Sequence, residues 1–125
     1  MASPIDQDFF ARLRALNDKF EASIPDTLAR MREQRRAFDI DAPDAENIRA
    51  LQETLHTIAG SAATFGFRAF GQQARALEQR LRVMMSFGTV APGDWQRWLE
   101  SLDEYIDWAA IDPKSGAQTG AADEQ

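Results

Sequence analysis

The chain contains no cysteine and only one histidine, His56. Without cysteine it can form neither a disulfide framework nor a thiolate nucleophile, a composition compatible with the cytoplasm. With one histidine, a zinc site would need carboxylates for most of its ligands, so we expect no metal site. No apolar run approaches the roughly 18 residues of a membrane span. The first ten residues lack the basic and apolar regions of a signal peptide, so we expect none.

The composition that remains is typical of a globular domain. Hydrophobic residues make up 44% and charged residues 27% of the 125 residues, enough for a single core. The net charge of −6 makes nucleic acid an unfavourable partner. We therefore expect a cytoplasmic, monomeric protein that binds neither nucleic acid nor membrane.

Apolar residues recur at helical spacing along most of the chain, and no strand pattern is present. The predicted helices span residues 6–22, 24–38, 44–65, 67–84 and 93–110. Pro25 separates the first two, with Ser23 as N-cap of the second, although the apolar stripe keeps its phase and one bent helix is the alternative. Asp44 and Gly66 are the predicted caps of the third helix.

Short connections between these helices favour antiparallel neighbours. The predicted fold is therefore an all-α antiparallel four-helix bundle of up-down topology with an additional N-terminal helix. We assign residues 1–112 to this bundle. Residues 113–125 are small and polar, and we expect a disordered tail or linker there.

The stretch LQETLHTIAGSAATFG, residues 51–66, contains the histidine. Wound as a helix, its apolar side chains form one stripe, and His56 points about 135° away from the centre of that stripe. The residues predicted to surround His56 are mostly small: Gln52, Ala59, Gly60 and Ala63. A glycine inside a helix costs about 1 kcal/mol relative to alanine, so Gly60 indicates that another surface approaches the imidazole closely.

An exposed histidine can serve as a base, a metal ligand or a nucleophile, or have no function. Small neighbours predict a flat surface, which suits a nucleophile better than a base acting in a substrate pocket. A nucleophilic imidazole needs an acceptor on its second nitrogen, and Glu78 is a candidate. In a hairpin turning at Gly66, His56 lies ten residues before the turn and Glu78 twelve after it, so the two are nearly level.

The run HTIAGSAATFGF, residues 56–67, followed by Leu77-Glu78, resembles the histidine-containing phosphotransfer (Hpt) domain. It is especially similar to the phosphoacceptor domain of bacterial chemotaxis kinases. The pattern of that family is H-x-x-K-G, a run of small residues, a glycine ten residues after the histidine and a polar residue 22 after it. The close match covers residues 48–82.

This resemblance implies that His56 is phosphorylated on Nε2, that Glu78 binds Nδ1 and that Gly60 gives the partner room. Arg82 stands where some members place a cation near the phosphoryl group. The implied partner is a response-regulator receiver domain, a hybrid sensor histidine kinase, or both, in a two-component phosphorelay. The receiver supplies its own aspartate and Mg²⁺, so the chain is expected to need no cofactor and to have no kinase domain.

One position departs from the pattern, because Ala59 stands where the family has lysine. The loss removes a charge-assisted contact to the phosphoryl group, which Arg49, Arg75 or Arg82 is a candidate to replace. A second hypothesis is accordingly a degenerate domain that binds a receiver without taking phosphate. A third, an enzyme that uses His56 as a base on a small substrate, requires a concave pocket beside the imidazole.

Overall fold

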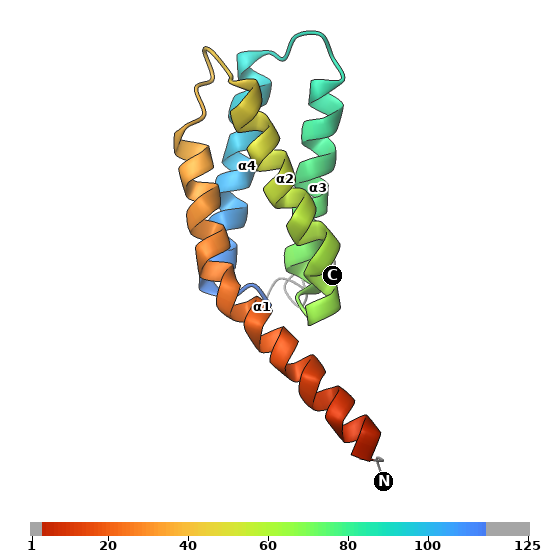
Figure 1. Ribbon diagram of the computed structural model, residues 1–125. Helices are drawn as coiled ribbons and strands as arrows, with labels where there is room; N and C mark the ends of the chain where they lie inside the picture. Colours follow the sequence, from red (N-terminus) through yellow and green to blue (C-terminus); the bar gives the residue numbers. More distant parts are fainter. Residues whose placement is uncertain (1–3, 115–125) are drawn as a thin grey trace, which may run out of the picture.

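A computed structural model describes residues 4–114, which form four α-helices (Figure 1). They are α1 (Pro4–Arg36), α2 (Ala45–Ser61), α3 (Arg68–Met85) and α4 (Pro92–Ile111), with one 3₁₀ turn, η1 (Ala63–Phe65), after α2. The described residues include no strand, so the predicted all-α class is confirmed. None of these helices is long and apolar enough to cross a membrane. Of the predicted tail, residues 115–125 lie outside the described part of the chain.

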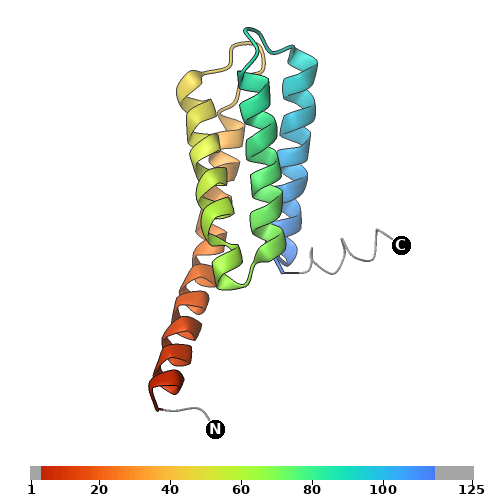
Figure 2. The same ribbon diagram turned by 90° about the vertical axis from the view of Figure 1, so that its right-hand side faces the viewer.

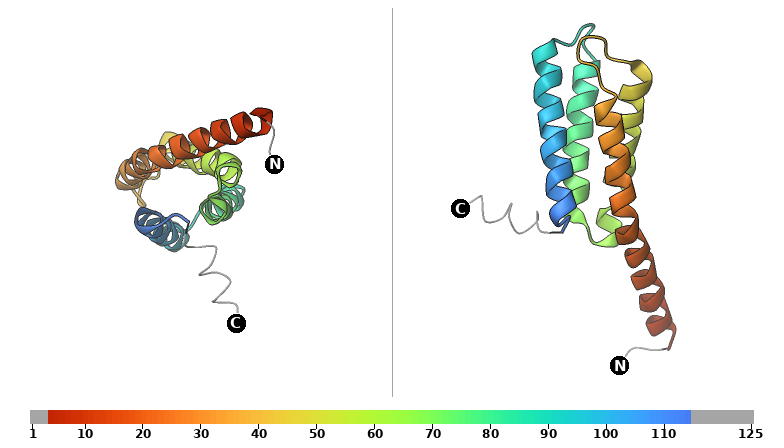
Figure 3. Two further views of the ribbon diagram at one scale, coloured as in Figure 1. Left: turned by 90° about the horizontal axis from the view of Figure 1, so that it is seen from below. Right: turned by 90° about the vertical axis from the view of Figure 1, so that its left-hand side faces the viewer.

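Successive helices run in opposite directions (Figure 2). Seen end-on, they form a ring in which each helix packs against two others (Figure 3). Helix α1 contacts α2 and α4, and α3 contacts the same two helices from the other side. All four helices contribute to one core, in which Met31, Leu55, Phe70 and Trp98 are completely buried. This is the up-down bundle expected from the short connections.

Two large side chains of α4 connect the core to the backbone of α3. The indole Nε1 of Trp98 donates to the carbonyl of Leu77 at 3.0 Å. The hydroxyl of Tyr105 donates to the carbonyl of Phe70 at 2.8 Å. Burial raises the pKa of the Tyr105 hydroxyl, so this group remains a donor. The polar tips of both side chains are therefore satisfied inside the core.

Helix α1 is a single helix with Pro25 inside it, so the predicted division into helices at 6–22 and 24–38 is wrong and the alternative of one bent helix is correct. Ser23 is not an N-cap, because its hydroxyl donates to the carbonyl of Phe20 within the continuous helix at 2.6 Å. The apolar stripe keeps its phase through the proline, so one helix buries Ile24 and Leu28 together. The axis bends near the proline (Figure 1), as expected where the ring displaces a backbone hydrogen bond.

The N-terminal half of α1 extends past the end of the bundle (Figure 3). It takes the place of the additional N-terminal helix in the prediction, but it continues into the bundle without a break. Its large apolar side chains have few neighbours, since Phe9 is 58%, Phe10 56% and Leu16 51% exposed. This extension is structurally separate from the core that positions His56.

Helix α2 begins as predicted, with the Asp44 carboxylate accepting from the backbone N–H of Asn47 at 3.1 Å. It ends at Ser61, four residues earlier than predicted, and η1 carries the chain on to Gly66. Gly66 has the left-handed conformation expected of it, with φ 90°. The backbone N–H of Phe65 donates to the carbonyl of Ala62 at 3.1 Å, and that of Gly66 donates to the carbonyl of Ala63 at 3.2 Å. These bonds span three residues, which is the 3₁₀ pattern that commonly ends an α-helix.

Close packing between α2 and α3 occurs at Gly71. A Cβ at this residue would lie 3.1 Å from Cβ of Ala62 and 3.5 Å from the backbone nitrogen of Ala63. The glycine therefore brings the backbone of α3 against the end of α2, almost two helical turns beyond His56.

A side chain at this contact should separate the two helices. We expect Gly71→Val to lower the free energy of unfolding by about 1–3 kcal/mol, the usual cost of overpacking. Urea unfolding followed by circular dichroism measures the change. The matched control is Gly60→Val on α2, where a new Cβ would meet no atom within 4 Å. An equal loss in both variants would contradict the role of Gly71.

Candidate functional site

His56 lies on the outer face of α2, with 70% of its side chain exposed. The opposite face of the helix carries the apolar stripe, and Leu51, Leu55 and Ile58 are buried in the core. The imidazole is held from one side only, because its Nδ1 lies 3.0 Å from Oε2 of Glu78 on α3. The spacing of ten and twelve residues around Gly66 thus brings these two side chains together.

Glu78 is almost inaccessible, with 6% of its side chain exposed. The same oxygen that faces His56 also accepts from a guanidinium nitrogen of Arg82 at 2.7 Å. A buried carboxylate is costly unless it is paired and hydrogen-bonded, and Arg82 provides that pairing one helical turn away. Glu78 is thus fixed in position by α3 itself before it contacts α2.

The contact with Glu78 determines which nitrogen of His56 is available. An ionised carboxylate only accepts hydrogen bonds, so Nδ1 of a neutral His56 carries the proton. Nε2 then has a free lone pair. The imidazole is 70% exposed and does not lie in an enclosed pocket, which counts against the hypothesis of an enzyme that acts on a small substrate.

The small residues predicted around His56 separate into two groups. Gly60 and Ala63 are exposed, and a Cβ at Gly60 would meet nothing within 4 Å. Ala59 is instead buried, with 9% exposed, where a side chain on the His56 face was expected. It lies toward α3, since Arg75 of that helix donates to its carbonyl at 3.3 Å. The outward surface beyond His56 is therefore formed by Gly60 and Ala63.

A shallow hollow of about 350 Å³ lies in front of the imidazole. Gln52 and Arg82 line it, as predicted for groups near His56, and so do Glu53 and Thr57, which the sequence analysis missed. Their positions three residues before and one residue after His56 on a helix were the available signal. The hollow contains two carboxylates, Glu53 and Glu78, and one cation, Arg82.

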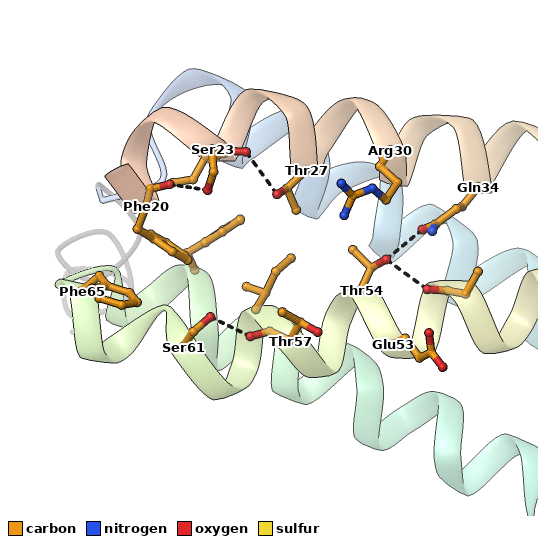
Figure 4. A pocket seen from close by; sticks show the side chains of 14 residues that line it. Phe20, Ser23, Thr27, Arg30, Gln34, Glu53, Thr54, Thr57, Ser61 and Phe65 are labelled. Carbon is orange, nitrogen blue, oxygen red and sulfur yellow. Dashed lines mark hydrogen bonds between the residues drawn. The ribbon is translucent and has the colours of Figure 1, made fainter. Parts of the chain in front are cut away.

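A larger groove of about 470 Å³ separates α1 from α2 beside this hollow (Figure 4). Phe20 and Phe65 stack at one end, with ring centroids 5.1 Å apart. Four hydroxyl groups in the walls already donate to backbone carbonyls of their own helices, namely those of Ser23, Thr27, Thr54 and Ser61. The shape of the groove depends on the angle between α1 and α2, and this angle cannot be predicted from helical periodicity.

The groove and the hollow share Glu53 and Thr57, so they form one continuous surface along α2. Within the part of the chain that the structure describes, no group of three or more histidine, cysteine or acidic side chains could hold a metal ion.

Comparison with known proteins gives one match. A family model described as the Hpt domain matches residues 15–108, well over half of the chain. No curated protein and no solved structure matches. The matched segment contains α2 and α3 entirely, and with them every residue discussed for the site.

The bond to Glu78 predicts one tautomer of His56. When the imidazole is neutral, we expect its proton on Nδ1. In Glu78→Ala this preference should be lost, so that the proton is shared between Nδ1 and Nε2. ¹⁵N chemical shifts of the two ring nitrogens measure the distribution. Glu53→Ala is the control, because it removes a carboxylate of the same hollow that has no bond to His56. An Nε2 proton in the unaltered chain would contradict the assignment.

Proposed function

Since the chain belongs to the Hpt domain family, whose members act as phosphocarriers in phosphorelays, we propose that His56 is its phosphoacceptor. The observation that carries the proposal is the bond between Nδ1 and Glu78, 3.0 Å long, on an imidazole that is otherwise exposed. It leaves Nε2 free to accept a phosphoryl group and later to release it. The protein would supply the histidine, and a partner would supply the phosphate.

In the proposed transfer, Nε2 attacks the phosphorus of an aspartyl phosphate on a receiver domain. The N–P bond forms, the P–O bond to the aspartate breaks, and its electron pair leaves with the carboxylate. Nδ1 keeps its proton, so the phosphorylated ring is positively charged, and Glu78 stabilises that charge. The reverse reaction returns the group to an aspartate. Mg²⁺ belongs to the receiver in this proposal.

The hollow beside His56 is the proposed place of the phosphoryl oxygens. Arg82 and the amide of Gln52 both line it and can donate hydrogen bonds. Arg82 is already bonded to Glu78, which fixes its guanidinium at the edge of the hollow. We assign both residues to contact with the phosphoryl group or the partner.

Gly60 and Ala63 are the proposed surface for close approach by the partner, with Ala59 beside them. Nothing within the fold requires a glycine at position 60, because a Cβ there would meet no atom within 4 Å. Its cost to the helix is about 1 kcal/mol relative to alanine. The close approach of a partner backbone to the imidazole would explain why a glycine stands at this position.

The proposed partner is a receiver domain, presented alone or as part of a hybrid sensor histidine kinase. A domain that covers His56 would also meet the groove between α1 and α2, since Glu53 and Thr57 line both depressions. We expect the protein to act as a monomer in the cytoplasm, where such receivers act.

A second candidate, favoured by Ala59, is a degenerate Hpt domain that binds a receiver but takes no phosphate. It differs from the first in one observable, because binding would then persist without phosphohistidine. The groove would serve either candidate equally. Phosphoryl transfer itself is therefore the discriminating measurement.

We expect phosphorylated receivers to label the protein with acid-labile, alkali-stable phosphate, and His56→Gln to abolish that label. The measurement is transfer of radioactive phosphate from a panel of receivers, with circular dichroism to show that the variant is folded. Label that survives in His56→Gln would refute the assignment. Receiver binding with no label on the unaltered protein would instead establish the degenerate domain.

Gly60 separates stability from function. We expect Gly60→Ala to raise the free energy of unfolding by up to about 1 kcal/mol, because alanine favours the helix. We expect Gly60→Leu to reduce transfer at least tenfold while the fold remains intact, because its side chain would project into the approach path. Urea unfolding and transfer rates are the two measurements. Normal transfer by Gly60→Leu would contradict a close approach at this residue.

A further inference from the structure

Phosphorylation would place a doubly charged anion beside two carboxylates. A phosphoryl group carries a charge of about −1.5 to −2 near neutral pH. Glu53 and Glu78 already line the hollow at His56. An anion in this setting requires a cation whose charge is not already neutralised by a carboxylate.

Two of the three candidate arginines already have ion-pair partners. Arg49 bonds Glu46 at 3.1 Å, and Arg82 bonds Glu78 at 2.7 Å. Arg75 has no carboxylate partner within the described chain, and its single hydrogen bond is to the neutral carbonyl of Ala59. Arg75 is therefore the one of the three that retains a full, uncompensated charge.

Arg75 also lies on the side of α3 that faces α2 and the His56 site. It precedes Glu78 by three residues, so both side chains project from the same face of the helix. Its guanidinium reaches α2 at Ala59, one helical turn beyond His56. The neighbouring Gly60 leaves the space above this turn open. Glu78 and Arg75 thus contact successive turns of α2.

The present bond of Arg75 is easily exchanged. It joins a guanidinium nitrogen to a carbonyl oxygen at 3.3 Å, at the long end of the range for hydrogen bonds. A guanidinium has five donors, of which this bond occupies one. A bond to a phosphate oxygen is charge-assisted and stronger, so a phosphoryl group within reach would compete for the side chain.

We propose that Arg75 binds the phosphoryl group on His56 and supplies from α3 the cation that α2 lacks at Ala59. The proposal rests on His56 being the phosphoacceptor. On phosphorylation the guanidinium turns from the Ala59 carbonyl to the phosphoryl oxygens, while Arg82 remains with Glu78. Arg75 would then favour the doubly ionised form of the phosphoryl group.

The test uses phosphoramidate, a small donor that phosphorylates imidazoles without a partner protein. ³¹P NMR then follows the ionisation of the phosphoryl group on His56 with pH. We expect Arg75→Gln to move the midpoint upward by about half a pH unit, as for one cation roughly 6 Å away in a water-like medium. The difference should shrink in 1 M salt.

The matched control is Arg80→Gln on the same helix. Arg80 lines the opposite side of α3, toward α4, so its removal should leave the midpoint unchanged. Both variants should unfold at the same temperature, which separates charge from structure. Addition of Ala59→Lys to Arg75→Gln should return the midpoint to that of the unaltered protein.

An unchanged midpoint in Arg75→Gln would overturn the assignment. A larger upward shift in Arg82→Gln than in Arg75→Gln would also overturn it, because Arg82 would then be the main cation of the phosphoryl group. Failure of phosphoramidate to label His56 would be a different result. It would refute the proposed phosphoacceptor, and the role of Arg75 with it.

Discussion

The contact between α2 and α3 is the constraint on which the site depends. Gly71 lets the backbone of α3 approach Ala62, and Gly66 reverses the chain with its left-handed conformation. Together they fix how far α3 can slide along α2. A shift of one helical turn, about 5.4 Å, would leave Glu78 without His56. The relative position of His56 and Glu78 is therefore a result of packing at the closed end of the hairpin.

Burial of Glu78 restricts the position of the carboxylate that contacts His56. A carboxylate with 6% of its side chain exposed cannot move freely, because any other position would leave it without Arg82 or water. His56 is the opposite case, exposed and held by a single bond. An immobile acceptor thus orients a mobile imidazole, and the imidazole can meet a partner without rearrangement of the core.

Much of this arrangement was predictable from local pattern. Periodicity identified the helical segments, and counting residues around Gly66 brought Glu78 level with His56. The predictions that failed were those in which packing between helices outweighed the local sequence signal. Pro25 predicted a break, but burial of the continuous apolar stripe of α1 outweighed the local cost. Ala59 was predicted on the surface because helical angle alone does not include the approach of α3. The groove was not predicted because its shape depends on the angle between α1 and α2.

The two sides of α2 differ in how substitutions would affect the orientation of His56. On the α3 side, the orientation of the His56 imidazole depends on its bond to Glu78. On the α1 side, the groove is formed by side chains that take no part in orienting the imidazole. Residues of α1 can therefore vary in size and charge while the bond between His56 and Glu78 stays in place. The surface that α1 shapes can thus change while α3 continues to hold the histidine in the same orientation.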